Sequence, residues 1–140
     1  MDAYGVRPPE QVLRTFDGVQ GPFGCCAVSP DGSTVALGSS SGGEIHISLV
    51  ALSGGAGREI TLEGWVSLTG LDWSADGRGL YLGYGAAHLG TLLYVDLKGN
   101  ATVLWQYKGG GTSGQPSPDG RYLAINGVAF NSNVWMLERL

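Results

Sequence analysis

The chain has 140 residues, of which 43% are hydrophobic, 14% are charged and 25 are glycine. Charged residues lie below, and glycines well above, their usual shares of about 25% and about 7%, a balance typical of short strands joined by tight turns. The net charge of -4 provides no basic surface for nucleic acids or anionic membranes, so we expect neither as a partner. The length predicts a single domain over residues 1–140.

The sequence contains no targeting or membrane signal. No stretch reaches the roughly 18 apolar residues that a spanning helix needs. Residues 1–10 have neither the basic start nor the apolar core of an export signal. We therefore expect no membrane insertion and, by default, a cytoplasmic location.

A four-residue motif recurs three times. It is Ser-Pro-Asp-Gly at residues 29–32 and 117–120 and Ser-Ala-Asp-Gly at residues 74–77, with spacings of 45 and 43 residues. Such spacing is typical of four-stranded β-propeller blades. Each aspartate is expected to accept hydrogen bonds from neighbouring groups, and each glycine to take a positive φ, which closes a tight turn. The predicted turn residues are Asp31, Gly32, Asp76, Gly77, Asp119 and Gly120.

Apolar and β-branched runs follow each motif in the order expected of a blade. Blade 1 is predicted at about residues 22–62 and blade 2 at about residues 66–106, each with four strands. Blade 3 is predicted at about residues 111–140, with a third strand at 133–138 and no fourth strand before Leu140. Residues 11–16 alternate polar and apolar side chains and are the candidate strand that closes a blade.

The turn motif, the apolar strand after it and the segment Asn133-Val134-Trp135-Met136 resemble the bacterial TolB-type, or WD40-like PD40, propeller repeat, over about residues 11–140. In particular, they resemble the C-terminal half of propellers attached to bacterial serine/threonine kinases or winged-helix regulators. The resemblance implies an all-β fold of three four-stranded antiparallel blades, half of a six-bladed propeller. It also implies a protein or small ligand bound at the channel mouth, no universal catalytic residue, and relatives that are often extracytoplasmic.

Three blades are fewer than the 4 to 8 that normally close a ring. Two completions stay open. In one, two copies of the chain form a six-bladed homodimer. In the other, the chain is a fragment, and the missing half of the propeller is supplied elsewhere.

Loops at one end of the blades provide the candidate binding residues. In propellers, the connections between blades share a face with the loops between second and third strands. Aromatic side chains on such loops are typical of recognition surfaces. The residues expected to converge on this rim are Trp65, Tyr84, His88, Phe130 and Asn131. Alternatively, Trp65 and Phe130 only cap the hydrophobic ends of blades. Core packing between blades is the interpretation for Trp73, Trp105 and Trp135.

The sequence predicts no catalytic residue, metal or cofactor, and therefore no enzyme. Residues 38–42 match the Gly-x-Ser-x-Gly pattern of hydrolases, but a strand rather than a helix follows Ser40. His46 and His88 alone are too few for a histidine-based zinc site. Cys25 and Cys26 are adjacent, and because neighbours on a strand point to opposite faces, we expect two reduced thiols.

Two alternative functions remain beside the binding module. One is a purely structural half-ring. The other is a propeller hydrolase, which needs carboxylates that converge at the channel mouth. The acidic residues able to approach that face are Asp17, Glu44 and Asp72.

Overall fold

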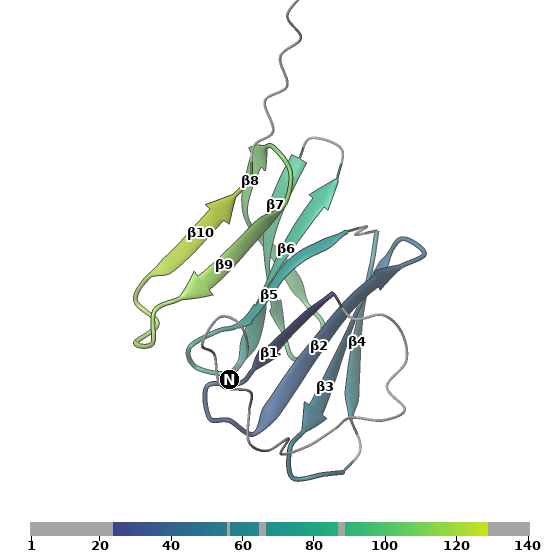
Figure 1. The fold of residues 1–140 in the computed structure, drawn as a ribbon, viewed down its shortest axis with the longest axis vertical. Coiled ribbons are helices and arrows are strands. Elements are labelled where there is room, and N and C mark those ends of the chain that lie inside the picture. Colours follow the sequence, from purple (N-terminus) through teal and green to yellow (C-terminus); the bar gives the residue numbers. More distant parts are fainter. Residues whose placement is uncertain (1–23, 56, 65–66, 87–88, 129–140) are drawn as a thin grey trace, which may run out of the picture.

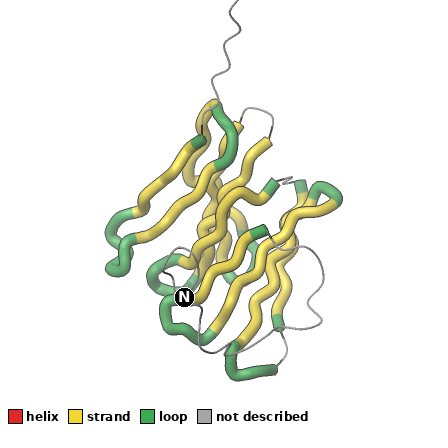
Figure 2. Tube along the Cα trace, in the orientation of Figure 1, coloured by secondary structure: helices red, strands yellow, loops and turns green. Residues whose placement is uncertain are grey.

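The computed structural model describes residues 24–55, 57–64, 67–86 and 89–128. All regular structure in these ranges is β-strand, as Figure 2 shows. In this part of the chain, no helix has the length and hydropathy needed to span a lipid bilayer. The all-β fold class is therefore confirmed.

The strands form three antiparallel sheets, which correspond to the three blades (Figure 1). Blade 1 contains β1 (Cys25–Val28), β2 (Thr34–Ser41), β3 (Glu44–Ala51) and β4 (Arg58–Glu63). Blade 2 contains β5 (Leu68–Trp73), β6 (Gly79–Ala86), β7 (Leu89–Asp96) and β8 (Ala101–Lys108). Blade 3 contains β9 (Thr112–Pro116) and β10 (Leu123–Gly127). Its predicted third strand at 133–138, and the candidate closing strand at 11–16, lie outside the described residues.

The sheets are arranged as successive propeller blades. Within each four-stranded sheet the strands follow chain order, so every neighbouring pair is joined by a short connection. The first strands of the blades are neighbours in space, because β1 contacts β5 and β5 contacts β9. The blades therefore form an arc with their first strands on the inside.

The interface between blades 1 and 2 contains the hydrophobic core. Ile45 and Ile47 of β3 alternate with half-buried residues, and their side chains are completely buried. They pack with Leu80 and Leu82 of β6, which are also completely buried. Trp73 is buried in the same cluster, and its indole Nε1 donates a hydrogen bond of 3.0 Å to the carbonyl of Ala27 in blade 1. The prediction that Trp73 packs in the core between blades is therefore confirmed.

The interface between blades 2 and 3 is built differently, from closely packed backbone. A Cβ atom at Gly83 of β6 would lie 1.6 Å from the carbonyl oxygen of Thr112 in β9. A Cβ atom at Gly70 of β5 would lie 2.6 Å from Cβ of Ser113. Thr69 and Thr112 add a reciprocal pair of hydrogen bonds between β5 and β9, of 2.8 and 3.1 Å. Only glycine permits this close approach.

These close contacts correct one sequence interpretation. The sequence predicts a loop between the second and third strands of blade 2 that holds Tyr84 and His88. Instead, β6 continues to Ala86 and β7 begins at Leu89, with Gly85 paired to Gly90. Glycine serves here to admit blade 3 rather than to form a turn.

Trp105 is a second correction. It was expected to fill a gap between blades, but it lies on β8, the outermost strand of blade 2, and 38% of its surface is exposed. Its ring stacks on Tyr107 with centroids 4.7 Å apart. Trp135 lies outside the described residues.

Candidate functional site

The repeated motif forms the same turn three times at one end of the blades. In blade 1, Ser29 Oγ donates to Asp31 Oδ1 at 2.7 Å, and the amide of Ser33 donates to the same oxygen at 2.9 Å. Gly32 has a φ of 75°, a conformation that favours glycine. Hydrogen bonds from the Ser33 hydroxyl, the Ser33 amide and the Ser29 hydroxyl lower the pKa of Asp31 to about 2. The aspartate is thus a structural acceptor.

The other two turns repeat this geometry. Ser74 Oγ donates to Asp76 at 2.6 Å, and Ser117 Oγ donates to Asp119 at 2.7 Å. The φ angles are 70° at Gly77 and 73° at Gly120. Ala75 in place of proline leaves the turn hydrogen bond from Gly77 to Ser74 intact at 3.0 Å. The turn end of the blades is therefore fixed by local bonds.

Two hollows separate neighbouring turns at this end. Each has a volume of about 460 Å³. The first lies between blades 1 and 2, with Asp31, Thr34, Trp73 and Asp76 among its lining residues. The second lies between blades 2 and 3 and includes Tyr81, Tyr94 and Asp119. The hollows show how a turn of one blade faces the sheet of its neighbour.

The opposite end of the blades is the rim toward which β2, β6 and β10 run in Figure 1. Here the connections between blades bond to the ends of neighbouring strands. The amide of Gly64 donates to Gly43 at 3.1 Å, and the amide of Gly85 donates to Ser67 at 3.0 Å. At blade 3, the amide of Val128 donates to Gly111 at 3.0 Å. These backbone bonds fix the supports of the rim loops.

Four of the five predicted rim residues lie outside the described residues: Trp65, His88, Phe130 and Asn131. Their described neighbours are at the rim, because Gly64 and Ser67 flank the segment with Trp65, and Leu89 follows His88. Tyr84 is described, and it lies in β6 within the hydrophobic core, with 8% of its surface exposed. The described flanks of these loops therefore lie at the rim, whereas the side chain of Tyr84 is buried in the core.

Ser40 is also at the rim, near the end of β2. Its hydroxyl accepts a hydrogen bond of 3.5 Å from the amide of Leu68 in blade 2. A strand, β3, follows it. Ser40 thus links two blades.

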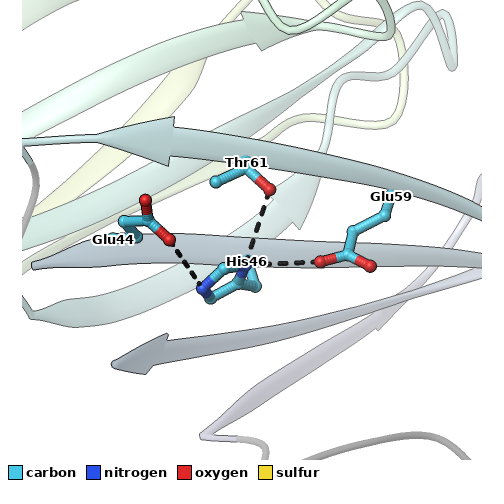
Figure 3. Close-up of polar contacts among 4 residues, drawn as sticks. All are labelled: Glu44, His46, Glu59 and Thr61. Atoms are coloured by element: carbon cyan, nitrogen blue, oxygen red, sulfur yellow. Dashed lines mark hydrogen bonds and ion pairs between the residues drawn. The ribbon is translucent and has the colours of Figure 1, made fainter. Parts of the chain in front are cut away.

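His46 lies on the outer face of blade 1, the face directed away from blade 2. Its Nε2 is 3.3 Å from a carboxylate oxygen of Glu44, and its Nδ1 is 3.3 Å from a carboxylate oxygen of Glu59. Thr61 lies 3.5 Å from the same Nδ1 (Figure 3). Sequence reasoning placed His46 in a strand but missed this polar cluster. The alternation of Glu44 and His46 was a signal for it, but the register of β4 was needed to add Glu59.

The described ranges contain no group of three or more histidine, cysteine or acidic residues arranged to hold a metal ion. The carboxylates considered for a hydrolase are separated. Asp72 is next to the turn end, where it accepts a hydrogen bond of 2.8 Å from the amide of Trp73. Glu44 begins β3 at the rim. Asp17 lies outside the described residues. Cys25 and Cys26 are free thiols, the first half-buried and the second exposed.

Comparison with solved structures supports the propeller assignment. The fold is similar to that of TolB from Acinetobacter baumannii, with a TM-score of 0.61 and 22% identity, over 88% of this chain and 30% of that chain. A protein from Lactobacillus plantarum aligns with a TM-score of 0.43 and 20% identity, over 75% of this chain and 35% of that chain. No family model and no curated protein matches the sequence. The chain has a TolB-like propeller fold and spans about 30% of the length of that TolB chain.

Proposed function

We propose that the chain is a non-enzymatic interaction or ligand-sensing module, made of three propeller blades of the TolB, WD40-like PD40 type. It binds a protein, peptide or small ligand through the rim loops that surround the channel mouth. The observation that supports this best is the construction of the rim. Backbone hydrogen bonds at Gly43, Ser67 and Gly111 fix the bases of three neighbouring connections on one side of the arc. Loops on a rigid scaffold are the usual place for recognition residues.

The chemistry of the rim favours a ligand that has both apolar groups and hydrogen-bond donors. Ser41 and Glu63 are exposed there, and Glu44 is half-exposed. Leu89 adds an exposed apolar side chain. The sequence adds the aromatic side chains of Trp65 and His88 to the same loops. Aromatic anchors beside acceptors are suited to a peptide that carries basic or amide groups.

We also propose that the ring is completed, because three blades are fewer than a closed propeller contains. A second copy of the chain, or further blades from a partner segment, provides this completion. The channel mouth then includes rim loops from both contributors.

A displayed library of random peptides tests the proposal. Peptides selected on the wild-type chain are expected to raise its melting temperature, because they bind the folded state. The Trp65→Ala and His88→Ala variants should lose this shift. Trp105→Ala is the matched control, since it removes an exposed tryptophan from the outer strand β8 and should keep the shift.

Three outcomes would contradict the proposal. Selection that enriches no peptide favours the purely structural half-ring. A selected peptide that binds Trp65→Ala and His88→Ala as tightly as the wild type places binding elsewhere. Cleavage of a bound peptide, detected by mass spectrometry, favours the hydrolase alternative.

A further inference from the structure

The two ends of the arc present sheet faces that no described blade covers. In blade 1, Ile45 and Ile47 point toward blade 2, so the alternate residues of the sheet point away from it. On this outer face Val28 is 58% exposed, and Cys26 beside it is exposed. Leu37 is paired with Cys26 and lies on the same face. The inner half of the outer face of blade 1 is therefore apolar.

The two described strands of blade 3, β9 and β10, also have an outer face with exposed residues. Gly114 and Leu123 are close to Leu92 of blade 2, so the alternate residues Ala124 and Asn126 point away, and both are exposed. Tyr122 lies two residues before Ala124 and therefore points to the same outer face, where 68% of its surface is exposed. The guanidinium of Arg121 lies 5.7 Å from the centroid of its ring. An aromatic side chain and a positive charge thus occupy this end.

The repeat defines how one blade meets the next. At the interface between blades 1 and 2, Thr34 lines one hollow together with Trp73 and Asp76. Tyr122 occupies in blade 3 the repeat position that Thr34 occupies in blade 1. Val28 and Asp31 occupy in blade 1 the positions of Trp73 and Asp76 in blade 2. A blade that follows blade 3 in the same relation therefore places residues of the Val28 and Asp31 type against Tyr122.

Blade 1 of a second copy fits this requirement. We propose that the outer face of blade 3 in one copy docks on the outer face of blade 1 in another copy, with Tyr122 over Val28 and Arg121 beside Asp31. Two such contacts about a two-fold axis close a six-bladed ring. The charges are complementary, and the contact continues the interface geometry already present inside the chain. Glu44, His46 and Glu59 then form the polar border of the contact.

This inference rests on the proposed completion of the ring, but it does not depend on what the rim binds. Light scattering across a dilution series tests it without any ligand. The wild-type chain is expected to have twice the monomer mass of 14.6 kDa. Val28→Arg and Tyr122→Asp should each raise the concentration of half-dissociation at least about 10-fold, because each puts a charge at a residue that the proposal places in the centre of the contact. Val103→Arg, at a valine that is 48% exposed on β8, should leave the mass unchanged.

Mixing the two variants tests the pairing itself. In the mixed dimer one contact is native, and in the other the introduced arginine faces the introduced aspartate, so the dimer should form again. Circular dichroism of each variant checks that the sheets remain folded. A monomeric wild-type chain, a mass above two copies, a dimer that neither substitution weakens, or a mixture that stays monomeric would overturn the proposal. A monomer that still binds a peptide through Trp65 would overturn the dimer while leaving the proposed function in place.

Discussion

The described contacts between blades 1 and 2 are mostly made by branched aliphatic side chains, whereas β5 and β6 meet β9 mostly through glycine backbone and side-chain hydrogen bonds. At the first, Ile47 and Leu82 are completely buried. At the second, the backbone of Gly83 approaches Thr112 so closely that no Cβ atom fits between them. The same repeat therefore joins successive blades in two ways, by packing large side chains between them or by bringing their backbones close together at glycine.

The two interfaces should respond to opposite kinds of substitution. An aliphatic interface is sensitive to lost volume, because a cavity forfeits both hydrophobic burial and packing contacts. A glycine interface is sensitive to added volume, because the backbones must separate to admit a side chain. Four predictions, taken from the largest expected effect to the smallest, sharpen this comparison.

Ile47→Ala should lower the free energy of unfolding by about 2–5 kcal/mol, because it removes a completely buried side chain from the aliphatic interface. Urea unfolding followed by circular dichroism measures the loss. Val103→Ala, at an exposed valine on β8, is the control and should change the free energy by no more than about 0.5 kcal/mol. Equal losses in the two variants would contradict the position of the core.

Gly83→Ala should lower the free energy of unfolding by about 1–3 kcal/mol, because the new methyl group collides with the Thr112 carbonyl. The amide of Thr112 should also exchange with solvent faster, since its hydrogen bond to Thr69 Oγ1 stretches. Gly24→Ala is the control, because a Cβ atom at Gly24 meets nothing within 4 Å. Unchanged stability of Gly83→Ala would disprove the close approach of blade 3.

Tyr107→Phe should lower the free energy of unfolding by about 1 kcal/mol, the usual value of one hydrogen bond. The Tyr107 hydroxyl bonds to the backbone of Gly111 and Val128, while its ring stacks on Trp105 and is kept in the variant. Faster exchange of the Val128 amide measures the local effect. Tyr122→Phe, at an exposed tyrosine, is the control and should leave that amide protected.

The turn aspartate Asp31 predicts that the stability of the fold depends on pH in the acidic range. Hydrogen bonds from Ser33 and Ser29 lower the pKa of Asp31 to about 2, below the value of about 3.9 expected in an unfolded chain. Since the folded state binds this proton more weakly, the stabilisation is present above about pH 4 and is lost as the pH falls toward 2. The melting temperature of Asp31→Asn should therefore fall less steeply over this range. Identical slopes would show that the turn carboxylate contributes nothing.

The blade repeat was predictable from sequence because it is local. Ser29, Asp31 and Gly32 specify a turn through their own hydrogen bonds and backbone preference, and the apolar runs after each turn specify strands. These signals need no knowledge of distant residues. They were sufficient for the all-β fold and for its likeness to TolB-type propellers.

Features that depend on contacts between blades were not predictable from sequence in the same way. Gly83 and Gly85 resemble loop residues until Thr112 is placed against the first and Gly110 and Gly111 against the second. Trp105, on an outer strand, resembles a residue that fills a gap between blades, but 38% of its surface is exposed. The cluster of His46 with Glu44 and Glu59 requires the pairing of two strands, which periodicity alone does not fix. Register and neighbouring blades therefore decide the roles of these side chains.

The central claim is that the three blades form one rigid support for a binding rim. The rim is a single surface only if blade 3 is fixed to blade 2, and hydrogen exchange of individual amides tests this most directly. The account predicts slow exchange at Thr112 and Val128, whose amides are bonded to Thr69 and Gly111, and faster exchange at both in Gly83→Ala. Exchange at the rate of an unfolded chain in the wild-type protein, while β6 and β7 stay protected, would contradict the account.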